Sequence, residues 1–402
     1  MSDLPPILRD HPLPLAWVEL PAFDHNLAML LEPAMAHRKR VRLATKSLRC
    51  PQLLQRAVRL AAGQVDGLMT FTARETLLWA QQGREILGEV AQNLLLGYPL
   101  GSLAEARMLA QANQHAHAAA MVDARQHVEW LQVAAVEGQI TIPVWLDLDL
   151  GWRPLDRVHL GVRRSPLRSG EDVMQLADFI SQQPNLKLEG VMGYEAHVAG
   201  LPDQGRLSVW QNPLKRLLKR RSWPDVLARR QAAVLALRPK FPHLRVNGGG
   251  SGSVHHTAQD PSVTELTIGS GLLAPHLFDG YHGLKFQPAL KFALPVTRLP
   301  APGYATCHGG GWIASGSAGL DRLPLPVFPP GLELLSQEGA GEVQTPLKLP
   351  DGVQLQIGDP VTFRPAKAGE LAEIFGQYAL IHGSGHMEQV PTYRGLGWLP
   401  WG

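Results

Sequence analysis

Cysteine is nearly absent from the 402-residue sequence, which contains only Cys50 and Cys307. Two cysteines cannot build a disulfide framework or a cysteine-based zinc cluster. No apolar stretch reaches the ~18–20 uninterrupted residues that a membrane span needs. The first residues, MSDLPPILRDHPLP, lack the apolar region of a secretory signal. The sequence therefore predicts a globular protein of a reducing, cytoplasmic compartment, with no membrane partner.

The excess of positive over negative charge is also small, since the net charge is +3 and 18% of the residues are charged. Positive charge is concentrated in residues 215–230 (KRLLKRRSWPDVLARR). Such a run can form a nucleic-acid-binding patch, but no RNA- or DNA-binding motif accompanies it. A pair of solvated helices flanking Pro224 is the simpler interpretation. We therefore expect no nucleic-acid partner.

Short apolar segments alternate with helical patterns between about residues 40 and 270. Thr72 and Ser102 are predicted helix N-caps, and Gly63, Gly83 and Gly138 are predicted C-terminal stops. Parallel strands need crossover helices, and eight of them in ~230 residues match a closed (β/α)8 barrel. The expected strands are Val41–Thr45, Asp66–Thr70, Asn93–Leu96, Ala119–Val122, Ile142–Leu148, Leu188–Met192, Leu244–Asn247 and Glu265–Ile268. The expected helices are Pro51–Ala62, Ala73–Gln82, Leu103–Gln114, Ala124–Val136, Glu171–Gln182 and Pro224–Arg238.

Two glycine-rich loops distinguish a barrel from an open doubly wound sheet. The run Gly248–Ser253 (GGGSGS) follows the seventh expected strand, not the first, and does not fit G-x-G-x-x-G. A barrel binds phosphate in the loops after strands seven and eight, and Gly269–Gly271 follows the eighth. Backbone N–H groups of Gly and Ser can approach a phosphate closely. The predicted phosphate-side residues are Asn247, Gly249, Gly250, Ser251, Gly252, Gly269, Ser270 and Gly271.

After about residue 290, short apolar segments alternate with Gly- and Pro-rich turns, which is typical of an antiparallel β-domain. Leu15–Leu20 precedes a helix that begins near Pro21, and we expect it to pair with this second domain. We assign residues 21–288 to the barrel and residues 1–20 with 289–402 to the β-domain. The expected strands of the latter are Leu290–Leu299, Ala305–His308, Leu332–Leu335, Val353–Ile357, Pro360–Arg364 and Gln377–His382.

Reacting groups of a barrel lie at the C-terminal ends of different strands. Lys46 follows the first barrel strand, where burial of an ammonium is unfavourable unless it is paired or neutralised. A Schiff base removes that charge and lets a lysine anchor an aldehyde cofactor. Taken singly, Lys46 also fits a surface lysine and His197 a structural histidine. The polar residues at the other strand ends are Asp147, Asp149, Arg153, Tyr194 and His197. Of these, Asp147 and Asp149 fit either an acid/base pair or a structural role.

These segments together resemble the fold-type III pyridoxal 5′-phosphate (PLP) enzymes, in particular the D-threonine aldolase/D-serine dehydratase-like branch, over nearly the whole chain. Arg42–Lys46 (RLATK) stands where the family has R-P-H-V-K, whose lysine carries PLP. Gly190–His197 (GVMGYEAH) resembles the strand beside cofactor and substrate, and Gly248–Ser253 resembles the phosphate loop GGGTGT. Bacterial amino acid deaminase/aldolase proteins are resembled by four further segments, which are HLGVRRSP, EGAGEVQTP, AKAGEL and QVPTYRG. The resemblance implies an alanine-racemase-like barrel with PLP on Lys46, contacted also by Arg153 and Tyr194.

One departure from that branch concerns its metal. The branch carries a P-x-H-x-C/D motif in the β-domain, whereas this sequence has Pro365–Glu370 (PAKAGE), with Lys367 and Gly369 at the ligand positions. Neither residue is a normal ligand of divalent metals, so we predict no metal site. We expect Lys367 to supply positive charge near the β-oxygen of a substrate, or else to be an exposed loop residue.

The resemblance implies a PLP-dependent lyase that cleaves or dehydrates a small β-hydroxy amino acid, of D configuration as in that branch. Lys46 and His197 are the expected bases and Lys367 the expected cation. The alternatives are a PLP-dependent amino acid racemase, which needs no metal, and a PLP-binding protein without turnover. The branch also implies a homodimer whose active site lies at the subunit interface, and residues 199–222 are placed to form a lid.

Overall fold

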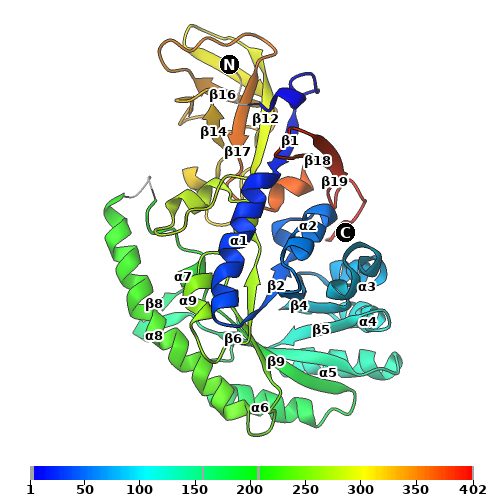
Figure 1. The fold of residues 1–402 in the computed structure, drawn as a ribbon. Helices are drawn as coiled ribbons and strands as arrows, with labels where there is room; N and C mark the ends of the chain where they lie inside the picture. Colours follow the sequence, from blue (N-terminus) through cyan, green and yellow to red (C-terminus); the bar gives the residue numbers. More distant parts are fainter. Residues whose placement is uncertain (1–3, 156–157, 206–208, 401–402) are drawn as a thin grey trace.

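Eight strands close into a parallel barrel within the described residues, and an antiparallel-rich sheet stands on one end of it (Figure 1). The computed structural model describes residues 4–155, 158–205 and 209–400. In barrel order the strands are β2 (Arg40–Ala44), β3 (Val65–Thr70), β4 (Asn93–Pro99), β5 (His117–Val122), β6 (Ile142–Asp149), β9 (Leu186–Tyr194), β10 (Arg245–Gly248) and β11 (Glu265–Ile268). The sequence prediction of the (β/α)8 barrel is therefore confirmed.

Helices surround the barrel and cover its outer face (Figure 1). They are α1 (Leu20–Ala36), α2 (Pro51–Leu60), α3 (Ala73–Leu87), α4 (Leu103–Asn113), α5 (Arg125–Glu137), α6 (Gly170–Ser181), α8 (Asn212–Leu237) and the short α7 (Ala196–Ala199) and α9 (Val254–Ala258). The hydroxyls of Thr72 and Ser102 accept hydrogen bonds from the N–H groups of Glu75 and Glu105, as N-caps do. Within the described part of the chain, none of the helices has the length and hydropathy of a membrane span.

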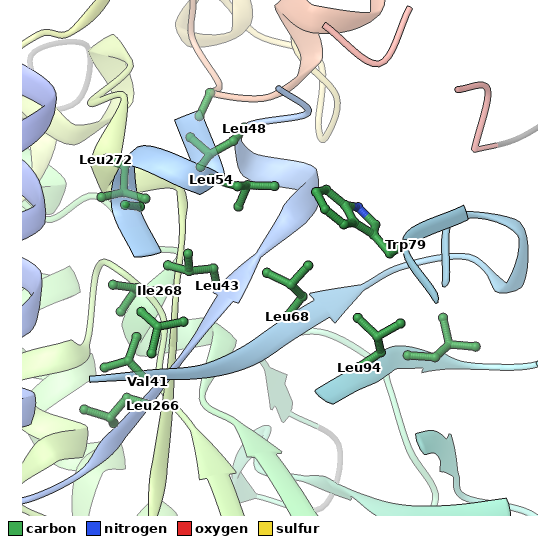
Figure 2. Packing of buried hydrophobic residues seen from close by; sticks show 14 of the residues in the cluster. Val41, Leu43, Leu48, Leu54, Leu68, Trp79, Leu94, Leu266, Ile268 and Leu272 are labelled. Atoms are coloured by element: carbon green, nitrogen blue, oxygen red, sulfur yellow. The ribbon is translucent and has the colours of Figure 1, made fainter. Parts of the chain in front are cut away.

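Successive residues of the barrel strands alternate between two apolar layers, as the pleat of a strand requires. Leu68 and Leu94 point outward to the layer under the helices, together with Val41, Leu43, Leu266 and Ile268 (Figure 2). Their neighbours Met69 and Leu95 point inward, where they pack with Trp145 and Met192. Burial of each such side chain contributes about 1.5–3 kcal/mol, so both layers stabilise the barrel.

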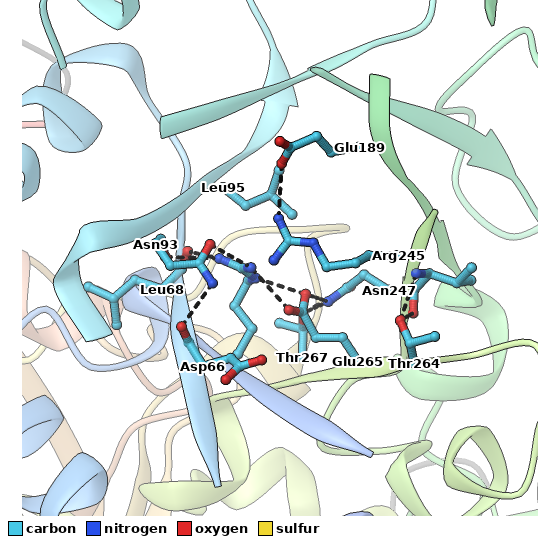
Figure 3. A network of polar contacts seen from close by, with 12 residues as sticks. Asp66, Leu68, Asn93, Leu95, Glu189, Arg245, Asn247, Thr264, Glu265 and Thr267 are labelled. Atoms are coloured by element: carbon cyan, nitrogen blue, oxygen red, sulfur yellow. Dashed lines mark hydrogen bonds and ion pairs between the residues drawn. The ribbon is translucent and has the colours of Figure 1, made fainter. Parts of the chain in front are cut away.

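A buried ion pair lies inside the barrel, in the network that Figure 3 shows. Arg42 donates from Nε and Nη2 to the two carboxylate oxygens of Glu265, at 2.8 and 3.0 Å. Its Nη1 donates to the carbonyls of Leu68 and Asn93, at 3.0 Å each. Glu265 also accepts a hydrogen bond of 2.7 Å from Asn247 Nδ2. Asn247 is thereby fixed at the end of β10 where the predicted phosphate loop begins.

The second sheet contains nine strands within the described residues, with the order β15-β16-β13-β12-β1-β18-β19 and with β17 between β12 and β14. The N-terminal strand β1 lies antiparallel to β12 and parallel to β18, so its predicted pairing with the second domain is confirmed. The predicted domain boundaries themselves stay a prediction. The strands are β1 (Leu15–Glu19), β12 (Leu290–Arg298), β13 (Tyr304–His308), β14 (Leu325–Phe328), β15 (Glu333–Leu334), β16 (Gln344–Lys348), β17 (Pro360–Arg364), β18 (Gln377–Ile381) and β19 (Met387–Pro391).

Three local predictions are wrong. The basic run does not form two helices at Pro224, because α8 continues through this residue; proline removes one backbone donor, here on an exposed side of the helix. Gly83 does not end α3, which continues to Leu87 and is followed by Gly88 at φ +60°. Val353–Ile357 pairs with no strand among the described residues, since it lies between two turns and leaves Ile357 exposed.

Candidate active site

A cavity of about 700 Å³ lies at the C-terminal ends of the barrel strands and is lined on one side by loops of the second sheet. The structure brings ten of the predicted site residues to its wall: Lys46, Tyr194, Asn247, Gly249, Gly250, Ser251, Gly252, Gly269, Ser270 and Lys367. Arg153, His197 and Gly271 do not line it. The cavity therefore joins the strand-end lysine, both glycine loops and the PAKAGE segment.

Lys46 lies in a single 3-10 turn, Thr45–Ser47, directly after β2. The turn is fixed because Thr45 Oγ1 donates to the carbonyl of Met69 on the neighbouring strand, at 3.0 Å. The Lys46 side chain extends into the cavity and places Nζ 4.0 Å from the centroid of the Phe71 ring. An ammonium over an aromatic face is a favourable cation–π contact. The lysine is thus directed to the cavity by β3 and by the residue that follows it.

Burial, followed by the positive charges of Arg164, Lys367 and Arg49, lowers the pKa of Lys46 from 10.5 to about 8, against the opposing charge of Glu75. Each of these charges disfavours or favours the ammonium form through space. A lysine with such a pKa carries an appreciable fraction of neutral amine near neutral pH. The neutral amine is the nucleophilic form, so the environment activates Lys46.

Arg164 lines the cavity although the sequence analysis did not select it. Its Nε donates to Asp147 Oδ2 at 2.7 Å, and its Nη2 donates to the carbonyl of Gly97 at 3.1 Å. Burial raises the pKa of Asp147 to about 6, against the effect of Arg164. Asp147 is therefore a partner that orients Arg164. The arginine belongs to the segment HLGVRRSP, which was the available signal in the sequence.

Of the three predicted site residues outside the cavity wall, Arg153 and His197 lie away from the glycine loops. Arg153 is on β7 (Trp152–Leu155), which forms a hairpin with β8 (Val158–Leu160), and its Nη2 lies 3.4 Å from Asp149. His197 is buried in α7, and neither ring nitrogen has a hydrogen-bond partner among the described residues. Burial lowers the pKa of His197. The lowered pKa favours the neutral form of the ring.

The two glycine loops are joined by one side chain. Ser251 Oγ accepts hydrogen bonds from the N–H groups of Gly269 and Gly271, at 3.2 and 3.0 Å. The N–H groups of Ser251, Gly252 and Ser270 have no hydrogen-bond partner among the residues that the structure describes. Three unpaired N–H groups at one end of a cavity form a nest for an anion. Gly271 contributes to this nest through Ser251, without lining the cavity.

Two of these glycines are also required by packing. A Cβ on Gly252 would lie 2.1 Å from the carbonyl oxygen of Ala199, and a Cβ on Gly269 would lie 2.5 Å from Ser47 Oγ. The first contact brings the phosphate-side loop against α7, and the second brings the eighth strand end against the Lys46 turn. The glycines therefore allow the loops to close around the cavity as well as to approach a ligand.

The PAKAGE segment reaches the cavity from the second sheet. Lys367 Nζ donates to Ser315 Oγ at 2.7 Å and lies 3.8 Å from Glu370, whose carboxylate also accepts a hydrogen bond from Ser315 Oγ. A Cβ on Gly369 would lie 1.7 Å from the carbonyl oxygen of Lys46, so a liganding side chain does not fit there. Among the described residues, no three His, Cys, Asp or Glu side chains are grouped so that they could hold a metal ion.

The residues of the cavity fit PLP. Lys46 supplies an amine for its aldehyde, and the unpaired N–H groups of Ser251, Gly252 and Ser270 supply donors for its phosphate. Tyr194 also lines the cavity, and burial raises the pKa of its hydroxyl to about 12. It therefore remains a hydrogen-bond donor at neutral pH. A cavity of about 700 Å³ has room for the cofactor and a small amino acid.

Three solved structures share this fold. D-threonine aldolase from Filomicrobium marinum has a TM-score of 0.79 and 19% identity, with 96% of each chain covered. D-threo-3-hydroxyaspartate dehydratase from Delftia sp. HT23 has a TM-score of 0.74 and 16% identity, covering 96% of this chain and 98% of that one. Alanine racemase from Clostridium difficile 630 has a TM-score of 0.62 and 13% identity, covering 95% and 99%. At these identities the likeness concerns the fold.

No curated protein matches the sequence. Residues 18–233, more than half of the chain, match the family described as "Alanine racemase, N-terminal domain". The match covers the barrel from α1 to α8, including Lys46 and the strand end at Tyr194. The chain therefore belongs to the alanine racemase N-terminal domain family, whose barrel is that of the fold-type III PLP enzymes.

Proposed function

We propose that this protein is a PLP-dependent lyase that acts on a small β-hydroxy amino acid of D configuration, by retro-aldol cleavage or by dehydration. The observation that carries the proposal is the single cavity with Lys46 and an N–H nest on its barrel side and the Lys367–Ser315–Glu370 group on its other side. An aldolase and a dehydratase are among the proteins with this fold, which supports the choice of reaction.

Lys46 is the residue that anchors the cofactor and then handles a proton at Cα of the substrate. Bound PLP supplies an electron sink for the pair that bond cleavage leaves at Cα. The pKa of about 8 lets the Lys46 amine accept and return a proton near neutral pH. Arg164 lies near Lys46, and apart from its hydrogen bonds to Asp147 and Gly97 it has donors that bind no other described residue. Since His197 lies outside the cavity wall, we assign it no proton transfer.

We assign Lys367, Ser315 and Glu370 to the β-hydroxyl of the substrate. In retro-aldol cleavage the hydroxyl loses its proton, the Cα–Cβ bond breaks and an aldehyde leaves. Glu370 can accept that proton, and the Lys367 ammonium stabilises the negative charge that develops on the β-oxygen. In dehydration the same ammonium donates a proton to the departing hydroxyl. Positive charge from Lys367 thus serves both reactions at the place where the related branch has its metal ligands.

Racemisation of an amino acid is the second candidate, because the matched family is that of the alanine racemase barrel and the reaction needs no group for a β-hydroxyl. A PLP-binding protein without turnover is the third. The wall that the second sheet contributes, from Ser315 to Glu373, argues against it, since binding of PLP alone requires only the barrel.

The reactions are separated by incubating the PLP-loaded protein with the D and L forms of threonine, serine and 3-hydroxyaspartate. Aldehyde indicates retro-aldol cleavage, a keto acid with ammonia indicates dehydration, and the opposite enantiomer indicates racemisation. The Lys46→Ala variant is the control, and it should lose both the visible absorbance of the lysine-bound cofactor and the product. A wild-type protein without this absorbance would overturn the cofactor assignment. Absorbance without any product would overturn the lyase.

We also propose a homodimer in which the second sheet of one subunit covers the barrel mouth of the other, as the family resemblance implies. Light scattering on the purified protein should give twice the mass of the 43.9 kDa chain. A mass of one chain with full activity would contradict this arrangement.

A further inference from the structure

Glu195 is a fully buried carboxylate that follows β9 and does not line the cavity. One oxygen, Oε1, accepts hydrogen bonds from Ser253 Oγ at 2.6 Å and from Thr257 Oγ1 at 2.5 Å. The other, Oε2, accepts from the N–H of Gly249 at 3.4 Å. All three donors belong to the loop and short helix that follow β10. A single carboxylate therefore holds both ends of the phosphate-side loop.

Arg230 of α8 holds Glu195 in turn. Its Nη2 donates to Glu195 Oε2 at 2.6 Å and to the carbonyl of Gly193 at 3.0 Å, while Nη1 donates to Asp260 Oδ2 at 2.6 Å. The side chains of Glu195, Arg230 and Asp260 are all fully buried. Buried charges of this kind are tolerated only when paired and hydrogen-bonded. The network thus ties the loop to β9, to α8 and to Asp260, which precedes β11.

The bonds to Glu195 divide the N–H groups of the loop into two sets. Gly249 donates to Glu195, and Gly250 donates to Ser253 Oγ at 3.2 Å. The next two N–H groups, those of Ser251 and Gly252, have no partner among the described residues, and these two residues line the cavity. A loop that is free to move would lose entropy when it ordered around an anion. Holding it in place beforehand removes that cost.

We propose that Glu195 is a positioning residue that preorganises the Gly249–Thr257 loop for the phosphate group of PLP, without touching the cofactor. The proposal rests on the cofactor part of the proposed function and holds for any of its reactions. The direction in which the affinity for PLP changes when Glu195 is replaced distinguishes two roles. If Glu195 acted only through its charge, its removal would strengthen binding of an anionic phosphate. If it acts as an anchor, its removal weakens that binding.

The test compares PLP with pyridoxal, which has the aldehyde but no phosphate, by titrating each into cofactor-free protein and following absorbance. In Glu195→Gln the carboxamide cannot accept all of the bonds that the carboxylate accepts. We expect the Kd for PLP to rise about tenfold or more, the loss of one hydrogen bond to a charged group, and the Kd for pyridoxal to stay nearly constant. Glu195→Asp, which retains the charge, should recover part of the loss.

Glu189→Gln is the matched control, because Glu189 lies on the same strand at the other end of the barrel, where it pairs with His117 and Arg245. It should leave both dissociation constants unchanged. If Glu195→Gln does not fold, Ser253→Ala and Thr257→Val each remove one bond to Glu195 and should show a smaller effect of the same kind. Equal weakening of PLP and pyridoxal, or tighter PLP binding, would overturn the proposal. Failure of the wild-type protein to bind PLP would instead refute the cofactor assignment.

Discussion

The Lys46 ammonium lies over the Phe71 ring at 4.0 Å from its centroid, and this ring is held by a buried carboxyl. The N–H of Phe71 donates to Glu75 Oε2 at 2.8 Å. Glu75 Oε1 accepts from Tyr393 Oη at 3.1 Å, and that oxygen accepts from Trp79 Nε1 at 2.6 Å. Tyr393 belongs to the segment QVPTYRG near the end of the described chain. The last residues of the second sheet therefore reach the barrel helix that supports the lysine.

The first prediction concerns the pH dependence of cofactor binding. Because burial and the neighbouring cations lower the pKa of Lys46 from 10.5 to about 8, the neutral amine should accumulate as pH rises through 8. The rate at which cofactor-free protein binds pyridoxal should increase with pH and level off above about pH 9, one unit past the midpoint. Pyridoxal is suitable since it has no phosphate to titrate. A midpoint near 10.5 would contradict the environment described for Lys46.

Phe71→Leu provides a second prediction on the same measurement. The aromatic ring favours the ammonium form by about 0.5–1 kcal/mol, so its loss should lower the midpoint by roughly half a pH unit. Phe179→Leu is the matched control, because Phe179 makes a similar contact with Arg125 on the outer helices. An unchanged midpoint in Phe71→Leu, or an equal shift in the control, would refute the role of the ring.

The barrel could be predicted from the sequence because its strands are apolar on both faces and because caps and glycines mark the ends of the helices between them. β6, for example, is buried at every position from Ile142 to Asp149. Three short strands were missed: β14 and β16 each contain a proline, and β19 exposes Glu388 and Gln389. Their pairing partners, rather than their own residues, make them strands.

The sequence identified candidate residues where they end a barrel strand, as Tyr194 does, or closely follow one, as Lys46 does. Arg164 was missed because the chain after β6 first forms the β7–β8 hairpin and then returns to the cavity. Arg153 was selected because it is close to β6 in sequence, but it lies on β7 and does not line the cavity. The predicted lid at 199–222 includes residues 206–208, which lie outside the described residues, so it stays a prediction.

Lys367→Met is the third prediction. If the ammonium stabilises charge on the β-oxygen, turnover of the best β-hydroxy substrate should fall about 100-fold or more, as when one such donor is removed. The Kd for PLP should change little. Removal of a cation should also raise the pKa of Lys46, because Lys367 is one of the charges that lower it. Lys367→Arg should retain part of the activity.

The control for Lys367 is Lys348→Met, since Lys348 is an exposed lysine of β16 outside the cavity wall. It should leave turnover and the pH midpoint unchanged. Full turnover in Lys367→Met would remove Lys367 from the reaction and leave it as a structural partner of Ser315 and Glu370.

The buried pair of Arg42 and Glu265 gives the last prediction, on stability. Burial opposes the charged form of Glu265, but Arg42 and Asn247 hold its pKa below the usual range. Arg42→Met would leave the carboxylate buried and uncompensated, at a cost of about 3–5 kcal/mol in the free energy of unfolding. Arg40→Met, on the same strand, breaks only the exposed pair with Asp66 and should cost less than about 1 kcal/mol. Urea denaturation of the cofactor-free proteins measures both.

A carboxyl whose pKa is lowered by folding stabilises the folded protein above its unfolded pKa, and this stabilisation is lost as pH falls through the folded pKa. Arg42→Met removes this contribution and leaves burial to raise the pKa of Glu265 in the folded variant. The difference from the wild type should therefore be largest near pH 7 and shrink as pH falls, because Glu265 takes up its proton at a higher pH in the folded variant than in the folded wild type. A difference that stays constant from pH 7 to pH 3 would show that lost packing, not the unpaired charge, sets the cost.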